Sequence, residues 1–111
     1  MTGSDLSSAL SSYCSHTYHL AAPEGLTEYI VWAEYGLKPI RGDDRTQLII
    51  PRVQIDAYCQ EDATLDALPT AGFLAGLLAA LDGIELAYEV QECGYDPDAA
   101  ATRLILQCDV A

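Results

Sequence analysis

The chain has 111 residues, of which half are hydrophobic, 17 are acidic and 5 are basic, and its formal net charge is −12. This composition excludes a globally disordered chain and allows one buried core. The negative charge disfavours binding to a phosphate backbone. We therefore expect a single domain over residues 1–111. Its acidic side chains keep the protein soluble, line a channel through which DNA passes, or mimic DNA in binding a basic partner.

The sequence predicts two helices. Residues 4–14 repeat apolar side chains at helical spacing and predict an amphipathic helix. Residues 64–83 predict a second helix, which Pro69 kinks or restarts near Leu68. Gly83 suits the left-handed position that follows the end of a helix.

The second predicted helix has no charged or polar side chain between residues 71 and 81. Its leucines form one ridge, which is typical of a core contact. The opposite face consists of small residues and requires a close neighbour, for which we expect another subunit. This subunit-contact face comprises Gly72, Ala75, Gly76 and Ala79. Because a membrane span needs about 20 apolar residues, we expect no membrane association.

The sequence also predicts four strands. They cover residues 29–35, 46–60, 85–92 and 102–110. The polar stretch 38–45 predicts a long exposed hairpin loop between the first two, and the turn-rich stretch 93–101 predicts a loop between the last two. Pro51 lacks an amide hydrogen and predicts an edge position or a bulge in the second strand.

The predicted order α-β-β-α-β-β indicates an α+β fold, with a four-stranded antiparallel sheet and two helices packed on one face. Matching the apolar faces of the last two strands places Tyr88 opposite Leu106. In that register Cys93 and Cys108 face opposite sides of the sheet, so we expect no disulfide between them. We find no secretory signal and expect the thiols to be reduced.

Catalytic motifs are absent from the sequence, which contains no phosphate-binding loop, hydrolase elbow or metalloprotease signature. We therefore expect neither an enzyme nor a cofactor or metal. A hydrolase or metal-dependent enzyme built on Cys14, His16 and His19 is one alternative. Nothing near these residues in the sequence orients a base or completes a ligand set.

Three stretches carry a resemblance to a known family: HLAAPEGLTEYIVWAEYG at 19–36, RVQIDAYCQ at 52–60 and ALDGI at 80–84. Together with the short first helix and the closing hairpin, they resemble the small tail-completion proteins of long-tailed bacteriophages, over residues 6–110. These proteins are also called tail terminators or head-to-tail joining proteins. The chain departs from the family pattern in Pro51, in Pro69, in its uncharged second helix and in its acidity.

The resemblance implies a structural role in the virion, at the neck of the tail, after assembly in the host cytoplasm. Such proteins form a ring, typically of six copies, that caps the tail tube and docks to the head connector or stopper protein. Genomic DNA passes through the ring without specific binding, which a negative lumen suits. The residues expected to reach a neighbour or to line the channel are Lys38, Arg41, Asp43, Asp44, Arg45, Tyr95, Asp96 and Asp98.

An acidic inhibitor that mimics DNA and binds a basic host or phage protein is the alternative from another class. It predicts acidic groups gathered on one face at phosphate-like spacing, and binding that weakens steeply with salt. The even spread of acidic residues along the sequence favours the ring protein.

Overall fold

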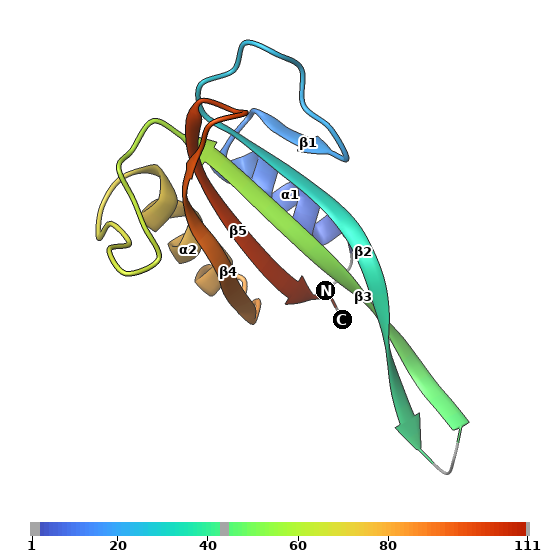
Figure 1. Cartoon of the computed structure of the whole chain (residues 1–111). Coiled ribbons are helices and arrows are strands. Elements are labelled where there is room, and N and C mark those ends of the chain that lie inside the picture. Colours follow the sequence, from blue (N-terminus) through green and yellow to red (C-terminus); the bar gives the residue numbers. More distant parts are fainter. Residues whose placement is uncertain (1–2, 43–44, 111) are drawn as a thin grey trace.

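The computed structural model describes residues 3–42 and 45–110, and the side chains of residues 4–36 and 50–110. Its elements are α1 (Gly3–Tyr13), β1 (Thr17–His19), β2 (Tyr29–Gly42), β3 (Arg45–Cys59), α2 (Phe73–Gly83), β4 (Tyr88–Asp96) and β5 (Ala101–Asp109). The strands form one five-stranded sheet in the order β1-β2-β3-β5-β4, and both helices lie on the same side of it (Figure 1). The predicted α+β class is confirmed.

The sheet is mixed and contains one strand more than the sequence predicts. β1 pairs with β2 in parallel, whereas the other neighbouring strands are antiparallel. The N–H of Ile30 donates to the carbonyl of His16, and the N–H of Leu20 donates to the carbonyl of Trp32, both at 2.9 Å. The prediction of four antiparallel strands is therefore wrong, because a strand of three residues is too short to show an alternation of apolar and polar side chains.

The hydrophobic core lies between the helices and one face of the sheet. Leu6 and Leu10 of α1 are fully buried, as their helical spacing predicts. The leucine ridge of α2, alternate residues of β3 and β5, and two residues of β2 also belong to the core: Leu74, Leu77, Leu81, Val53, Ile55, Ala57, Cys59, Leu104, Leu106, Cys108, Ile30 and Trp32. The intervening residues of β3 and β5 point to the other face, which neither described helix covers.

The second helix begins at Phe73 rather than at the predicted Thr64. Pro69 removes a main-chain donor, and Gly72 has a φ of 100°, which is incompatible with helical geometry. The carboxylate of Glu61 accepts a hydrogen bond from the N–H of Phe73 and so caps the first turn from outside the helix. The long predicted helix is therefore wrong in its first half and correct from Phe73 onward. Its predicted end is wrong in one respect, because Gly83 is the last helical residue and the left-handed conformation occurs at Glu85, whose φ is 58°.

A bulge at Gln91 sets the register of β4 against β5. Tyr88 pairs with Cys108 rather than with the predicted Leu106. Because a bulge inserts one extra residue, the side chains that follow it move to the other face. Cys93 is consequently buried on the same face as Cys108, which corrects the prediction that the two thiols face opposite sides.

The β2–β3 hairpin extends beyond the rest of the sheet (Figure 1). The last pair between β3 and β5 joins Arg52 to Asp109, whereas β2 and β3 continue to pair as far as Gly42 and Arg45. We call residues 37–42 and 45–50 the arm, and the remainder the body. The principal extents of the molecule are 48, 29 and 27 Å.

Candidate interaction surfaces

The arm contains the first predicted interaction segment. Lys38 and Arg41 lie in β2, and Arg45 begins β3, so most of the predicted exposed loop is paired strand. Asp43 and Asp44 lie outside the described residues. Side-chain polarity predicted a loop, but the main-chain pairing that extends both strands does not depend on polarity.

Each strand of the β2–β3 hairpin carries a proline, Pro39 within the arm and Pro51 where the arm joins the body. The N–H of Val110 donates to the carbonyl of Pro51 at 2.9 Å. The N–H and C=O of one residue in an antiparallel strand point to the same side, so the nitrogen of Pro51 also faces the β5 side. Ile49 shares this orientation, and its partner Pro39 therefore turns its nitrogen away from β3. Pro51 thus lies where β3 loses its neighbour β5, in agreement with the predicted edge position, and Pro39 removes a main-chain donor from the β2 edge of the arm.

The second predicted segment lies at the turn between β4 and β5. Tyr95 and Asp96 belong to β4, so the predicted loop is partly strand, and Asp98 lies in the turn itself. The N–H of Asp98 donates to Asp96 Oδ1 at 3.0 Å, which closes the turn. Thr102 pairs with Cys59, at the end of β3 that is far from the arm. The two predicted segments therefore occupy opposite ends of the sheet.

A hollow of about 240 Å³ opens beside this turn, and we call it the turn hollow. Its polar lining comprises Glu92, Tyr95, Asp96, Asp98 and Arg103. The guanidinium of Arg103 lies 3.8 Å from Asp96 and 2.5 Å from Asp56. Glu92 and Asp98 form no ion pair with any residue whose side chain is described. The turn hollow therefore keeps an excess of negative charge.

The sheet face that neither helix covers carries two stacked tyrosines beside an ion pair. The rings of Tyr29 and Tyr58 stack with centroids 4.6 Å apart, and the guanidinium of Arg103 lies 5.7 Å from the Tyr58 centroid. Burial acts to lower the pKa of Arg103, but the hydrogen bond and charge of Asp56 outweigh it and raise that pKa. Asp56 therefore keeps Arg103 charged, and the bond between them fixes the position of both side chains.

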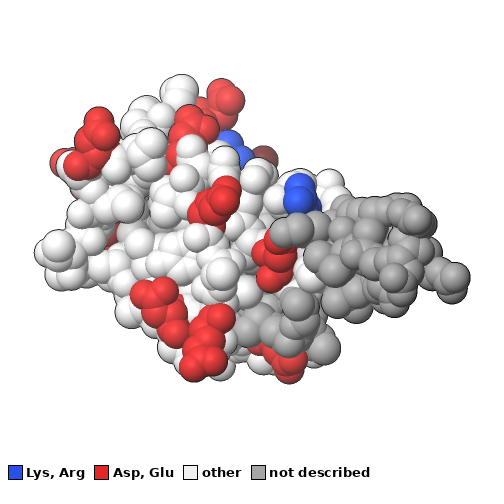
Figure 2. Space-filling view, turned by 90° about the horizontal axis from the view of Figure 1, so that it is seen from below, with Lys and Arg blue, Asp and Glu red and all other residues white. Residues whose placement is uncertain are grey.

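Acidic side chains are dispersed over the surface. Figure 2 shows Asp and Glu in separate groups, with uncharged surface between them and small areas of Lys and Arg. Of the basic residues whose side chains are described, Arg52 pairs with Asp109 at 3.6 Å and Arg103 pairs with Asp56. Each described arginine is thus compensated within the chain.

The predicted subunit-contact face of α2 divides into covered and exposed parts. A Cβ at Gly76 would lie 2.3 Å from the hydroxyl oxygen of Tyr13 in α1. Gly72 precedes the helix and is required there by its φ of 100°. Ala75 is half-buried and Ala79 is exposed. The close neighbour of Gly76 is therefore α1 of the same chain, and Ala79 is the exposed member of this set within the helix.

A larger hollow, of about 630 Å³, lies between the end of α1 and the start of α2. Cys14 and His16 line it, whereas His19 lies elsewhere. His19 stacks on Trp32 with centroids 4.1 Å apart, and its Nε2 lies 2.7 Å from Glu34 Oε2. Burial raises the pKa of the Cys14 thiol, which opposes formation of the thiolate that a nucleophile requires. The three residues of the hydrolase hypothesis therefore do not form one site.

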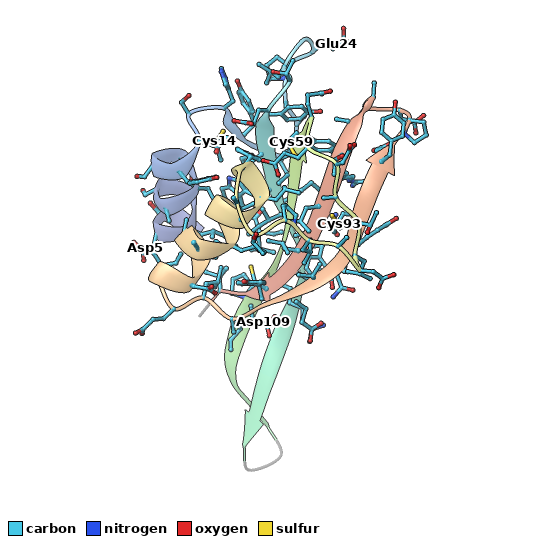
Figure 3. All side chains as sticks on the ribbon, turned by 90° about the vertical axis from the view of Figure 1, so that its left-hand side faces the viewer. Asp5, Cys14, Glu24, Cys59, Cys93 and Asp109 are labelled. Carbon is cyan, nitrogen blue, oxygen red and sulfur yellow. The ribbon has the colours of Figure 1, made fainter. Side chains whose placement is uncertain are left out.

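The four cysteines are free thiols. Figure 3 shows Cys14 and Cys59 toward one end of the molecule and Cys93 further along the sheet. Burial raises the pKa of Cys108 to about 11, and it also raises the pKa of Cys59 and of Cys93. Among the described residues, no group of three or more His, Cys, Asp or Glu side chains is arranged to hold a metal ion.

Comparisons of the chain with models of protein families, with curated proteins and with solved structures found no match. In the described part of the chain, no helix is long and apolar enough to cross a membrane. The function must therefore be inferred from the surfaces of the molecule.

Proposed function

We propose that this chain is a structural protein of a bacteriophage virion, located at the neck, where a ring of copies caps the tail tube and joins it to the head connector. The observation that carries this proposal is the arm. It leaves the body as a two-stranded ribbon, and its strands pair with no other described strand. Because a two-stranded hairpin alone is marginal in water, the arm requires a partner.

The charge of the chain supports a role around DNA without binding it. DNA carries one negative charge per about 1.7 Å of helix axis. A ring whose subunits each carry a net charge of −12 repels the duplex from its wall, so DNA moves through the lumen without adhering. The partners of the chain in this proposal are five further copies of itself, the tail tube protein and the head connector or stopper protein.

A DNA-mimic inhibitor would require a different arrangement of acidic side chains on the surface. Its carboxylates must gather on one face so that they replace a row of phosphates. The dispersed acidic groups in Figure 2 give no such row on the face that is shown, and this favours the ring protein.

Native mass spectrometry across a wide range of protein concentration, at low and moderate salt, tests the proposal together with a tube-binding assay. We expect a discrete hexamer, and we expect purified tail tubes that lack a terminator to deplete the free protein from solution. Protein that remains monomeric and also ignores the tubes would contradict the proposal. Salt-sensitive one-to-one binding to a basic nuclease or repressor would support the inhibitor instead.

A further inference from the structure

The sheet face that neither described helix covers has the composition of an interface. Ile30 and Trp32 of β2 are buried in the core, so the residues that alternate with them point away from the helices (Figure 1). Tyr18 of β1 pairs with Val31 and lies on the same side. We call the residues of the body that point to this side the open face. Its tyrosines and aliphatic residues include Tyr18, Tyr29, Tyr58, Val31, Ala33 and Ile105. This composition is typical of an interface rather than of a solvated sheet face.

The charges at the centre of the open face are compensated within the chain. Asp56 pairs with Arg103 at 2.5 Å, and Arg52 pairs with Asp109 at 3.6 Å where the body meets the arm. The chain as a whole carries a net charge of −12, so two copies repel each other wherever unpaired carboxylates meet. The open face therefore allows two copies to approach without bringing unpaired carboxylates together at its centre.

The open face also has hydrogen-bonding groups that a copy of itself can satisfy. The Nε atoms of Arg52 and Arg103 are buried without a hydrogen-bond partner among the described residues, which is unfavourable. The two side chains nevertheless stay 42% and 32% exposed, so their guanidinium groups can still donate to a partner. Gln54 and Gln107, which are paired across β3 and β5, supply amide oxygens as acceptors. Donors and acceptors on one surface make that surface complementary to a second copy.

The size of the open face suits a contact between two copies. From Arg52 to Cys59 it is about 26 Å long at about 3.3 Å per residue, and five strands about 4.8 Å apart make it about 24 Å wide. These dimensions give about 600 Å² per copy and about 1,200 Å² for a pair, which reaches the range of specific interfaces. Two sheets commonly pack face to face in this way, about 10 Å apart.

We infer that two copies of the chain pair through their open faces, about a two-fold axis parallel to the strands. Glu89 and Glu92 lie in the edge strand β4, opposite Gln107 and Ile105 of β5. An axis parallel to the strands places β4 of each copy over β1 and β2 of the other and so separates these carboxylates from their own copies. An axis across the strands would superpose them. The favoured axis brings Gln54 of β3, the middle strand of the sheet, close to Gln54 of the second copy.

The pair does not rest on the proposed ring. Contact between identical surfaces closes after two copies, whereas a ring of equivalent subunits repeats a contact between unlike surfaces. The pair is therefore a second assembly, which the free protein forms at concentrations below those that give the ring. Binding to a tail tube opens it.

A lysine in the open face tests the pair by sedimentation equilibrium. We expect Ile105→Lys to raise the dissociation constant of the pair at least about tenfold, because the lysine places a charge within the contact. Ala79→Lys is the control, since it makes the same charge change at an exposed residue of α2, on the other side of the sheet. We expect moderate salt to tighten the wild-type pair, because it screens the repulsion between two copies of charge −12.

Cross-linking tests the axis and does not depend on how well Ile105→Lys folds. The background is Cys14→Ser, because the other three native thiols are buried. We expect a short bismaleimide to join two copies of Gln54→Cys, and to leave Ala79→Cys as a monomer.

The outcomes separate the pair from the ring. Equal association of the two lysine variants, or equal cross-linking at positions 54 and 79, overturns the pair and leaves the ring standing. Pairs that cross-link at position 54 but form no hexamer and ignore tail tubes support the pair and contradict the ring. Free protein that stays monomeric up to millimolar concentration overturns the pair, and the tube-binding assay then decides the ring alone.

Discussion

The hydroxyl of Tyr13 donates a hydrogen bond of 2.5 Å to the main-chain carbonyl of Phe73, and so joins the end of α1 to the first turn of α2. The two rings lie with centroids 5.5 Å apart. Gly76, further along α2, leaves the space that the Tyr13 ring occupies. Burial raises the pKa of the Tyr13 hydroxyl, and the charge of Glu28 raises it further, so the hydroxyl remains a donor. The two helices therefore form one connected layer over the sheet.

Removal of this hydroxyl should loosen the helix layer. We expect Tyr13→Phe to lower the free energy of unfolding by about 1 kcal/mol, because the partly buried carbonyl of Phe73 loses its side-chain donor. Urea denaturation followed by circular dichroism measures the change. Tyr18→Phe is the control, since its hydroxyl lies 3.4 Å from His16 Nδ1 in an exposed contact. An equal decrease in the free energy of unfolding of the two variants would show that the hydrogen bond of Tyr13 contributes no more to stability than the exposed contact of Tyr18.

The space at Gly76 gives a second prediction. We expect Gly76→Ala to lower the free energy of unfolding by about 1–3 kcal/mol, because its Cβ overlaps the Tyr13 side chain. Gly83→Ala, in the last turn of α2, should stay within about 0.5 kcal/mol because nothing lies near its added Cβ. Both values come from urea denaturation.

The same variant also tests the predicted subunit-contact role of Gly76. If Gly76→Ala leaves the free energy of unfolding unchanged but weakens self-association, the residue acts between subunits rather than against Tyr13. If the loss of stability disappears when Tyr13 is replaced by Leu, the contact within the chain is its cause.

Alkaline pH should destabilise the fold through its buried thiols. Burial raises the pKa of Cys108 from 9.0 to about 11, so the folded state keeps a proton that the unfolded state releases between these values. Stability is therefore unaffected below about pH 9 and falls as the pH rises toward 11. The urea midpoint measured across this range should decline, with a smaller decline in Cys108→Ala. A wild-type midpoint that stays constant across this range would contradict the assignment.

The prolines on the two strands of the β2–β3 hairpin, Pro39 and Pro51, should protect the hairpin from aggregation. We expect the double variant Pro39→Thr with Pro51→Thr to scatter more light and bind more thioflavin on mild heating, since each edge gains an outward N–H. Pro23→Thr, in an exposed connection, serves as the control. Equal scattering from the two variants would mean that the edges are protected by something other than proline.

The sequence predicted well the elements in which the spacing of apolar and polar side chains shows which residues are buried. Leu6 and Leu10 recur at helical spacing, and Val53 and Ile55 alternate with polar residues, so local periodicity sufficed for α1 and for the central part of β3. The charged residues of the candidate surfaces could likewise be identified from the sequence. The turn hollow was not, because it forms only when Arg103 of β5 lies beside the β4 residues.

The features that the sequence missed depend on backbone geometry or on pairing between distant segments. β1 exists because β2 supplies its partners. The start of α2 depends on the positive φ of Gly72 and on the Glu61 carboxylate. The register of β4 depends on the bulge at Gln91. None of these leaves a periodic signal in the sequence, so pattern reasoning could not recover them.

The bulge at Tyr35 in β2 lies next to the pair formed by Gly36 and Arg52, at the point where the body gives way to the arm. A bulge bends and twists its strand, so the bulge at Tyr35 sets the direction in which the arm leaves the body. The Tyr35 hydroxyl, which lies 3.4 Å from its acceptor Gln107 Oε1 in β5, connects the bulge to the body. Deletion of Tyr35 would therefore change the direction of the arm relative to the body without changing any other residue of either part.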